Sequence, residues 1–479
     1  MDIKIKLKDI SFSKFSAIDT FGKVFYYDDK IYRLISDEYK TFCLEWFSNG
    51  LIDKLNKEQL IPYTSIETEL KIEENPDSLI LRHERLRETY IGEWSFTMIK
   101  TAALTILKLN QLLNEYNYEL KDSHPYNILF KGRKALWVDL GSISFKKSNS
   151  WVAADEFIDS FYIPLKLWEV NEFYFLNKAL NDKWFPHQRF LPSLDIRSSR
   201  LFKDLQMDVY HKKIEFRTKN TQRNLNIHFL GIGYVLRALN YIARKVTGKQ
   251  GAPFQVSSNL KPLAEVYSII SSISKKENQS TWSNYHTQYY SDQISDRLNF
   301  IVDKCISLHK KSILDLAGNQ GLVGSLISKK AKGKIDIITT DYDENALDYG
   351  FNHIDSSEDN INFTLINCIL AGQRDETIYK RLKSDIVLAL AVTHHLILGQ
   401  GYNLEYILNE FRQFTNEYLL IEFMPKGLWK VGDEFPELPV WYNESWFESK
   451  LQLHFKIIEK TVLETNRILY LAKLHETEN

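Results

Sequence analysis

Two acidic residues, Asp315 and Asp341, each follow an apolar run and stand 26 positions apart. The runs have the length of buried strands, and residues 322–327 between them have the apolar spacing of an amphipathic helix. The turn after the first run is built mainly from small residues: Ala317, Gly318, Asn319 and Gly321. Small residues let backbone N–H groups approach a ligand at the carboxyl end of a strand, and a carboxylate after the next strand can accept both hydroxyls of a ribose. The pattern predicts a site for a nucleotide-like ligand.

Both acids also have structural explanations that leave this prediction open. A carboxylate at Asp315 would suit the cap of the following helix, and Asp341 would suit an exposed loop. The order of the later segments favours the ligand site. Residues 385–390 and 418–425 are further apolar runs, each preceded by a helix-like segment, and 453–463 with 468–473 have the pattern of a closing hairpin.

This ordered set resembles the class I S-adenosylmethionine-dependent methyltransferases over about residues 282–475. The resemblance implies a Rossmann-like α/β domain with a seven-stranded sheet and one antiparallel strand. It also implies that the cofactor S-adenosylmethionine lies with its methionine part over residues 317–321, its ribose on Asp341 beside Tyr342, and its adenine near Asn367 and Cys368. Ala317 and Asn319 replace the first two glycines of the usual turn in this family. Tyr285, in an aromatic stretch upstream, is expected to pack on the sulfonium or to fill the core.

Two adjacent histidines, His394 and His395, follow the apolar run 385–390. Transfer of a methyl group to a hydroxyl needs a group that takes the proton, and a neutral imidazole suits that role. We favour His395, which is further past the strand end, over His394; Glu422 in the next run is a further candidate. One of two adjacent histidines usually points into the core, so a structural role for the pair stays open.

A second group of polar residues lies in the amino-terminal part: Asp122, Asn127 five positions later, and Asp139 after a short hairpin pattern. The spacing resembles the catalytic loop and metal-binding acid of kinase-like folds, especially aminoglycoside-type phosphotransferases. The resemblance implies that Asp122 orients a hydroxyl as the base and that Asn127 and Asp139 hold Mg²⁺ on the phosphates of ATP. Arg33 stands where this family has a lysine, and no glycine-rich loop precedes it, so we predict a degenerate module. A purely structural loop is the alternative.

Composition limits the choice of partners. The 479 residues contain 61 Lys and Arg against 62 Asp and Glu, a net charge of −1, so no excess positive charge is available to hold a nucleic acid. Three widely spaced cysteines form neither a disulfide framework nor a thiolate zinc site. Charged residues interrupt the first ten positions, which argues against a signal peptide, and the charge-free run 386–404 contains too many polar residues for a membrane span. We therefore expect a cytoplasmic protein with no membrane span.

The chain accordingly divides into three predicted sections: an α+β, kinase-like module over 1–148, a helical connector or substrate region over 149–280, and a methyltransferase domain over 281–479. The motifs together resemble a little-characterised bacterial methyltransferase family, one member of which has been linked to nodulation. We predict methyl transfer to an oxygen or nitrogen of a small-molecule, sugar or glycan acceptor that the amino-terminal half binds. The alternatives are a bifunctional kinase–methyltransferase that uses Mg-ATP, a non-catalytic binding module, and an RNA methyltransferase.

Overall fold

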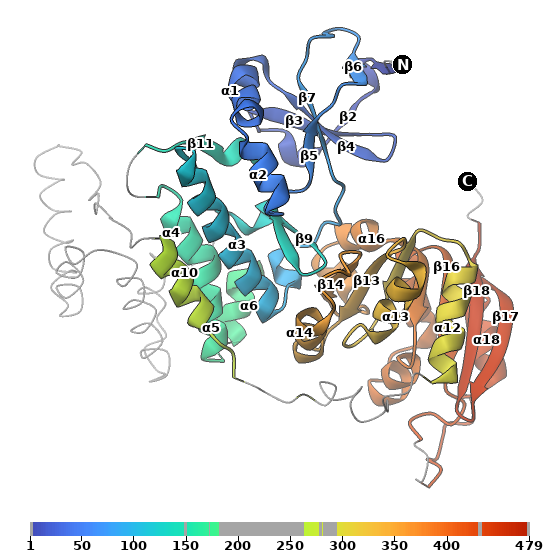
Figure 1. Ribbon diagram of the computed structural model, residues 1–479. Helices are drawn as coiled ribbons and strands as arrows, with labels where there is room; N and C mark the ends of the chain where they lie inside the picture. Colours follow the sequence, from blue (N-terminus) through green and yellow to red (C-terminus); the bar gives the residue numbers. More distant parts are fainter. Residues whose placement is uncertain are drawn as a thin grey trace, which may run out of the picture. The chain divides into compact units, whose positions relative to one another are not determined.

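The computed structural model describes residues 3–147, 151–171, 173–181, 263–276, 280, 295–429 and 434–476 (Figure 1). The chain divides into two compact units. The amino-terminal unit comprises Met1–Arg85, Ile99–Ile128 and Ala135–Lys276, and the carboxyl-terminal unit comprises Leu86–Met98, Leu129–Lys134 and Glu277–Asn479. Within the predicted sections, residues 149–276 fall in the first unit, and residues 86–98 and 129–134 of the first section fall in the second.

The carboxyl-terminal unit is built around one seven-stranded sheet of order β14-β13-β12-β15-β16-β18-β17. Its strands are β12 (Ser312–Asp315), β13 (Asp336–Asp341), β14 (Ile361–Leu365), β15 (Ser384–Ala389), β16 (Thr415–Phe423), β17 (Phe455–Glu464) and β18 (Arg467–Leu474). Neighbours pair in parallel except at β18, which pairs antiparallel with both β16 and β17. The predicted class I methyltransferase fold, with seven strands and one antiparallel strand, is confirmed, as is the closing hairpin.

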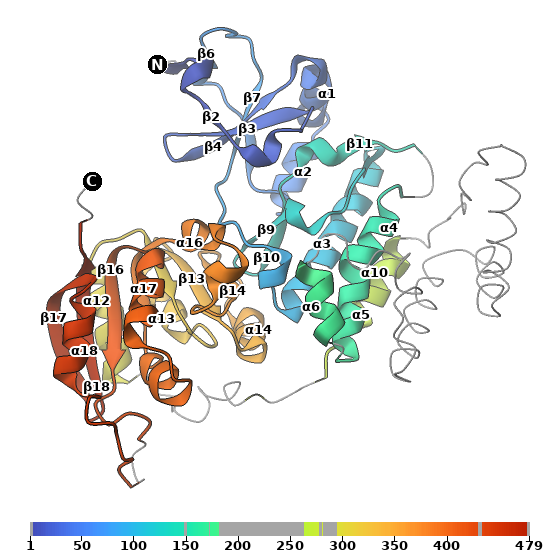
Figure 2. The same ribbon diagram turned by 180° about the vertical axis from the view of Figure 1, so that it is seen from behind.

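Helices cover both faces of this sheet. Figure 1 shows α12, α13 and α14 in front of it, and Figure 2 shows α17 and α18 on the opposite face. The helices of this unit are η3 (Ile91–Glu93), α12 (Asp296–Ser307), α13 (Leu322–Ala331), α14 (Glu344–His353), α15 (Ala371–Arg374), α16 (Thr377–Leu382), the π-helix η7 (His395–Gly399), α17 (Leu404–Phe414) and α18 (Glu444–Leu451). With both faces covered, the central strands are buried on both sides; every residue of β12 is buried.

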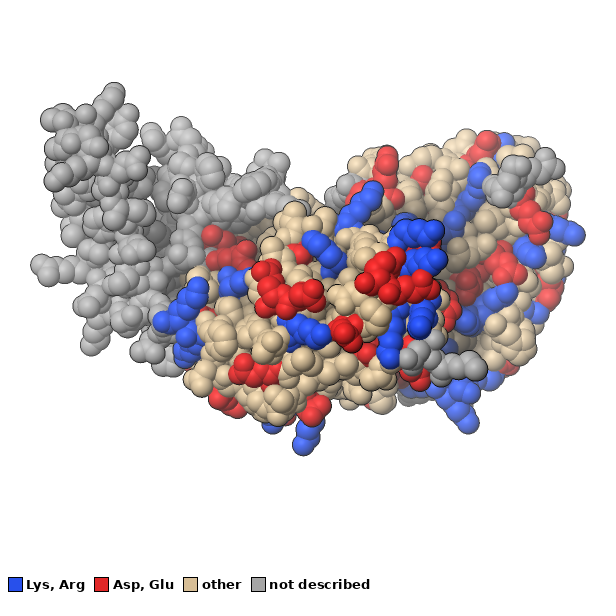
Figure 3. Space-filling view, turned by 90° about the horizontal axis from the view of Figure 1, so that it is seen from above, with Lys and Arg blue, Asp and Glu red and all other residues tan. Residues whose placement is uncertain are grey.

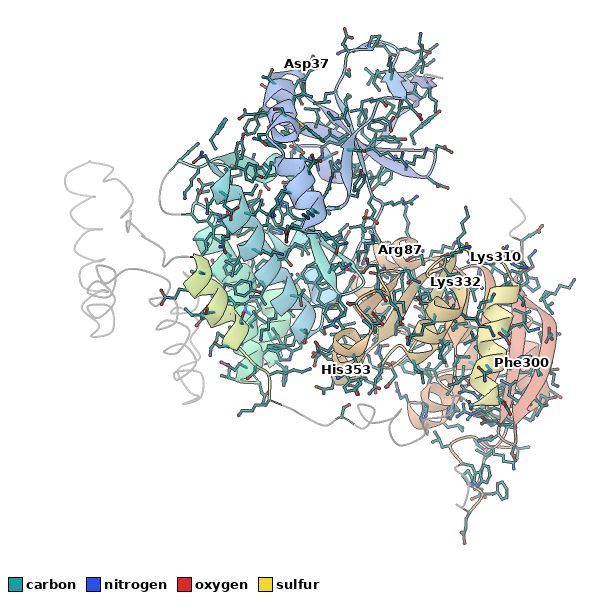
Figure 4. All side chains as sticks on the ribbon, in the orientation of Figure 1. Asp37, Arg87, Phe300, Lys310, Lys332 and His353 are labelled. Atoms are coloured by element: carbon teal, nitrogen blue, oxygen red, sulfur yellow. The ribbon has the colours of Figure 1, made fainter. Side chains whose placement is uncertain are left out.

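Two short segments from the amino-terminal part of the sequence complete this unit. Arg381 of α16 makes a buried ion pair with Glu93 and lies over the ring of Tyr90, 4.2 Å from its centroid. Arg87, labelled in Figure 4, binds Asp336 at 2.7 Å. Further on, the backbone N–H of Gly132 donates to the side chain of Asn362 in the edge strand β14. Residues 86–98 and 129–134 are therefore bound to the methyltransferase fold by charged and polar contacts.

The amino-terminal unit has the predicted α+β character. Its main sheet has five antiparallel strands in the order β2-β3-β4-β7-β5. The strands in this part of the sequence are β1 (Ile3–Ile5), β2 (Ser11–Phe12), β3 (Gly22–Tyr27), β4 (Lys30–Ile35), β5 (Thr64–Ile66), β6 (Leu70–Ile72), β7 (Ile80–His83), β8 (Tyr118–Leu120), β9 (Ile128–Lys131), β10 (Lys134–Trp137) and β11 (Ile143–Phe145). Asp28 and Asp29 both have positive φ between β3 and β4, as a two-residue hairpin turn requires.

Helices form the rest of this part. They are η1 (Leu7–Asp9), η2 (Lys14–Ser16), α1 (Asp37–Ser48), α2 (Leu51–Lys57), α3 (Phe96–Glu115), η4 (Pro125–Asn127), η5 (Leu140–Ser142), α4 (Ala154–Phe157), the π-helix η6 (Ile158–Tyr162), α5 (Ile163–Glu169), α6 (Phe173–Asn181) and α10 (Leu263–Ser272). The apolar spacing of residues 92–120 predicts one helix over that whole range, which is too long. The helix ends at Glu115 because Asn117 takes a left-handed conformation, and Tyr118–Leu120 then pairs with β11 as a strand.

Charges of both signs are interspersed on the face drawn in Figure 3, in keeping with the almost neutral composition. A membrane-crossing helix would need a long apolar stretch, and none of the helices in the described part of the chain provides one.

Candidate functional site

The loop after β12 has an unusual backbone. Ala317, Asn319 and Gly321 have φ of +53°, +54° and +76°, so three alternate residues lie in the left-handed region. A residue other than glycine pays a steric cost there, of which asparagine pays the least. This alternation turns the chain sharply at the end of β12. Since β12 lies between β13 and β15, the loop stands where the order of the strands reverses, which is the position at which open α/β sheets bind ligands.

Gly318 is needed for the close contact of this loop with Asp315. A Cβ atom added at Gly318 would lie 2.5 Å from Oδ2 of Asp315 and 2.9 Å from a methyl group of Thr339. Asp315 is 1% exposed, and its Oδ2 has no hydrogen-bond partner among the described residues. Helix α13 begins at Leu322, and its N-cap residue, Gly321, makes no side-chain cap, so a helix-capping role does not account for Asp315.

Asp341 closes the other side of the same turn. Its Oδ2 accepts a 2.8 Å hydrogen bond from the backbone N–H of Asn319, and its Oδ1 accepts one of the same length from Asp343. The carboxylate is 5% exposed, which excludes the alternative of an exposed loop acid. Asp341 therefore holds the loop after β12 against the end of β13.

Both carboxylates resist ionisation. Burial, together with the nearby charge of Asp341, raises the pKa of Asp315 to about 7. Burial also raises the pKa of Asp341 to about 6, although the backbone N–H groups of Asp343 and Asn319 oppose the rise. Two buried acids of elevated pKa at the carboxyl edge of the sheet, one with an oxygen that lacks a donor, mark a place that a ligand with hydrogen-bond donors or positive charge would complete.

The remaining candidates for cofactor contact differ in exposure. The ring of Tyr342 is 55% exposed directly after Asp341. Asn367 is exposed and accepts a hydrogen bond from the backbone of Ile369, whereas Cys368 is buried, which raises the pKa of its thiol to about 12. Tyr342 and Asn367 thus present side chains at the ends of β13 and β14. Tyr285 lies outside the described residues.

The two histidines follow β15, with ring centroids 4.1 Å apart. His394 is 5% exposed and its Nδ1 is buried with no hydrogen-bond partner in the described part of the chain. Burial, with help from His395 and Arg467, lowers the pKa of His394 to about 2, so this ring is neutral at ordinary pH and a weak proton acceptor. His395 is only partly buried and begins η7, so it is the ring of the pair that reaches the surface.

Glu422 lies in β16, fully buried, in an ion pair with Arg297 of α12. Nε and Nη2 of Arg297 each donate to one carboxylate oxygen at 2.7 Å, and the backbone N–H of Ala391 donates at 2.9 Å. Burial alone would raise the pKa of Glu422, but the charges of Arg297 and Arg467 outweigh it and hold that pKa below its usual range. This carboxylate is a poor proton acceptor. Its bond to Ala391 instead fixes the loop that carries the histidines.

The predicted amino-terminal group also comes together. The side-chain amide of Asn127 donates to Asp122 at 3.0 Å, and the guanidinium of Arg33 lies 2.8 Å from Asp19 and 3.6 Å from Asp139. Burial and the charges of Asp139 and Glu156 raise the pKa of Asp122 to about 6, and burial raises the pKa of Asp139 against the opposing charge of Arg33. No group of three or more side chains in the described residues is arranged to hold a metal ion.

Sequence reasoning missed Arg297, which positions Glu422, and it missed the contact of Asp341 with the Asn319 backbone. Arg297 stands in a stretch without a recognisable motif, 125 positions before its partner. The only local signal is an arginine on the apolar side of a helix, directly before Leu298 and one turn before Ile301. A buried arginine requires a carboxylate, but the sequence does not indicate which one.

Comparison with known proteins gives one similar curated sequence and several solved structures. The chain is 25% identical over 487 residues to nodulation protein NoeA of Rhizobium meliloti (strain 1021), with 94% of each chain covered. The expected similarity to a nodulation-linked protein is thus confirmed. No family model matches the sequence.

Two solved methyltransferases are similar over 40% of this chain. One is the magnesium protoporphyrin IX methyltransferase ChlM from Synechocystis PCC 6803, at 13% identity, 93% coverage of that chain and a TM-score of 0.31. The other is a SAM-dependent methyltransferase from Aquifex aeolicus, at 15% identity, 98% coverage and a TM-score of 0.30. The bifunctional kinase-methyltransferase WbdD is similar at 16% identity over 40% of this chain and 41% of its own, with a TM-score of 0.29.

Proposed function

We propose that this protein transfers a methyl group from S-adenosylmethionine to an oxygen or nitrogen atom of a small-molecule, sugar or glycan acceptor, with a hydroxyl oxygen favoured. The observation that carries the proposal is the pair of buried carboxylates at the point where the strand order reverses. Asp315 has an oxygen without a donor, and Asp341 is fixed by two backbone N–H groups. A cofactor with a ribose and a positively charged amino-acid part supplies the donors and the charge that this site lacks.

The residues present suit this cofactor. The loop of 317–321 lies close against Asp315 with no room for a side chain at Gly318, which places the loop backbone beside the carboxylate that lacks a donor. Asp341 would accept the ribose hydroxyls, and Tyr342 and Asn367 would flank the adenine. Once bound, S-adenosylmethionine supplies an electrophilic methyl group on a cationic sulfur and leaves as a neutral thioether.

The chain's own contribution is alignment and proton removal. As the acceptor oxygen bonds to the methyl carbon, its proton must leave, and we assign His395 as the acceptor of that proton because it is the more exposed ring. Asp315 holds positive charge beside the turn. Glu422 accepts a hydrogen bond from the backbone of Ala391 and so positions the loop that carries His395. We assign this positioning role to Glu422 in place of the proton-accepting role predicted from the sequence. Positioning of this kind can supply much of the rate enhancement of a displacement reaction.

Calorimetric titration with S-adenosylmethionine, followed by a screen of metabolites and glycans with labelled cofactor, tests the proposal. We expect binding and label transfer to at least one hydroxyl compound. Changing His395→Gln should lower the rate by about 10²- to 10⁴-fold with cofactor affinity unchanged. His394→Gln is the matched comparison. Equal turnover in wild type and His395→Gln would contradict the assignment of the base, and absence of cofactor binding would contradict the function.

A second function, phosphoryl transfer from Mg-ATP, has one supporting observation: Asp122, Asn127, Asp139 and Arg33 lie in one group. The contacts within that group favour a kinase-like module that has lost phosphoryl transfer. Arg33 already pairs with Asp139, and Asn127 already donates to Asp122. The role of the amino-terminal half in binding the acceptor, and a cytoplasmic location, stay predictions.

A further inference from the structure

A loop rich in exposed aromatic and apolar residues follows the carboxyl end of β16. We define the aromatic loop as residues 424–429 and 434–442. Its exposed large apolar side chains are Leu428, Phe435, Val440 and Trp441. Clusters of this kind are uncommon on a soluble surface unless they bind something.

The exposed ring of Trp441 is held in place by its neighbours. It is 48% exposed, yet its centroid lies 4.8 Å from that of Trp446 and 6.0 Å from that of Tyr442. Tyr442 is buried, and its hydroxyl donates to the carbonyl of Met424 at the start of the loop. Trp441 therefore presents a rigid, flat surface to solvent.

A second pair of rings lies on the same loop. Trp429 and Phe435 stack at 5.2 Å with an interplanar angle of 14°, and the ammonium of Lys426 lies within 5 Å of both ring centroids. The side chain of Asn466, in the turn between β17 and β18, accepts from the Lys426 backbone at 2.7 Å and donates to Gly427. The turn between β17 and β18 thereby holds the first half of the aromatic loop.

The aromatic loop adjoins the histidine-bearing loop. Strands β15 and β16 are parallel, so the segments that follow them leave the same edge of the sheet. A Cβ atom added at Gly427 would lie 2.7 Å from a methyl group of Leu398 and 2.8 Å from one of Leu438. Leu398 belongs to η7, which begins at His395. The aromatic loop therefore contacts the helix that begins with the group that we assign to proton removal.

We propose that the aromatic loop binds a carbohydrate acceptor, with a pyranose ring stacked on Trp441. This inference rests on the proposed function and names its substrate class. A pyranose offers one face of C–H groups, which suits an aromatic ring, and a rim of hydroxyls, which need hydrogen-bond acceptors. The exposed Glu434 and Glu437 of the loop provide such acceptors and would repel phosphates of a nucleic acid. The oxygen of a hydroxyl on the stacked sugar is also an atom that the proposed reaction would methylate.

Saturation-transfer NMR on the full-length protein tests this binding directly. The probes are cellotetraose, maltotetraose and chitotetraose, each without and with S-adenosylmethionine. We expect at least one of them to receive saturation at its ring C–H protons, and Trp441→Ala to weaken that binding by about 3- to 10-fold. Trp441→Phe keeps a flat ring and should retain most of the binding. Tyr349→Ala removes another exposed ring of the same unit, 43% exposed on α14, and should have no effect.

The outcomes separate the two proposals. Wild-type protein that binds S-adenosylmethionine by calorimetry but none of the three oligosaccharides would overturn the carbohydrate proposal alone, and protein that binds neither would overturn both. Unchanged binding in Trp441→Ala would overturn the placement on this loop. Binding of phosphatidylcholine vesicles through Trp441, in place of an oligosaccharide, would also overturn the proposal. Equal cofactor affinity in wild type and Trp441→Ala shows that the variant is folded.

Discussion

Each of the two units gathers acids, which are buried in the carboxyl-terminal unit and partly buried in the amino-terminal unit, and the two units balance the charge differently. In the carboxyl-terminal unit, Asp315 keeps an oxygen without a hydrogen-bond partner among the described residues, and backbone N–H groups fix Asp341. In the amino-terminal unit, the guanidinium of Arg33 lies against Asp139, and the amide of Asn127 binds Asp122. One oxygen of Asp315 in the first group lacks a donor, whereas side chains of the protein contact both acids of the second group.

This difference shows why residue spacing alone does not identify a binding site. Both groups were predicted from spacing, and the structure brings both together. Only the contacts distinguish them: a carboxylate that a side chain of the protein already contacts gains little from a cation, while a buried carboxylate with an oxygen that has no donor gains a great deal. The following predictions test this contrast, beginning with the largest effect.

Two buried arginines, Arg33 in the amino-terminal unit and Arg297 in the carboxyl-terminal unit, allow a direct comparison. Arg297→Met should lower the free energy of unfolding by about 3–5 kcal/mol, because it leaves Glu422 buried, charged and without its main partner. Arg33→Met should cost about 1.5–3 kcal/mol, since Asp19 and Asp139 are 21% and 24% exposed at their side chains and can reach water. Urea unfolding measures the losses, and hydrogen exchange assigns each loss to its unit. A larger loss of unfolding free energy in Arg33→Met than in Arg297→Met would contradict this comparison of the two units.

Asp341 tests the carboxyl-terminal site. Asp341→Ala should weaken S-adenosylmethionine binding by about 1.5–3 kcal/mol, the scale of a lost hydrogen bond to a charged group. Asp336→Asn, at the other end of the same strand, is the control, because Asp336 contacts Arg87 away from the carboxyl edge. Calorimetry measures both. Unchanged affinity in Asp341→Ala would show that the ribose lies elsewhere.

The elevated pKa of Asp315 predicts how cofactor affinity depends on pH. With a pKa of about 7, the free carboxyl is protonated below pH 7, and only its ionised form attracts a cationic ligand. Affinity should therefore rise by up to about tenfold per pH unit between pH 5 and 7 and level off above, and binding should release protons. Since Asp315 and Asp341 interact, the measured midpoint belongs to the pair.

Asp315→Asn should flatten this dependence. The check is calorimetry in two buffers of different ionisation enthalpy, which counts the protons released. Affinity that falls as pH rises would mean that the site prefers a neutral or anionic ligand.

Much of the fold was predictable because it rests on local patterns. The turn at Asp28 and Asp29, the strand before Asp315 and the hairpin of β17 and β18 all follow from residues close together in sequence. Residues 86–98 and 129–134 could not be assigned to the methyltransferase fold, because their contacts are distant: Glu93 and Arg381 are 288 positions apart. For the same reason, the partner of Glu422 was not predictable, although the position of Glu422 on a strand was.

The smallest effect that we expect is the response of the amino-terminal unit to Mg²⁺ and ATP. Addition of Mg²⁺ and ATP should leave the thermal unfolding midpoint unchanged, whereas S-adenosylmethionine should raise it according to its concentration relative to Kd. A metal ion would have to replace Arg33 beside Asp139 and the Asn127 amide on Asp122, so it would lose contacts that the chain already makes. Asp139→Asn should lower stability, because Arg33 loses a carboxylate, but should leave the ATP response at zero. A Mg²⁺-dependent rise with ATP that disappears in Asp139→Asn would instead show a working nucleotide site and favour the bifunctional kinase–methyltransferase.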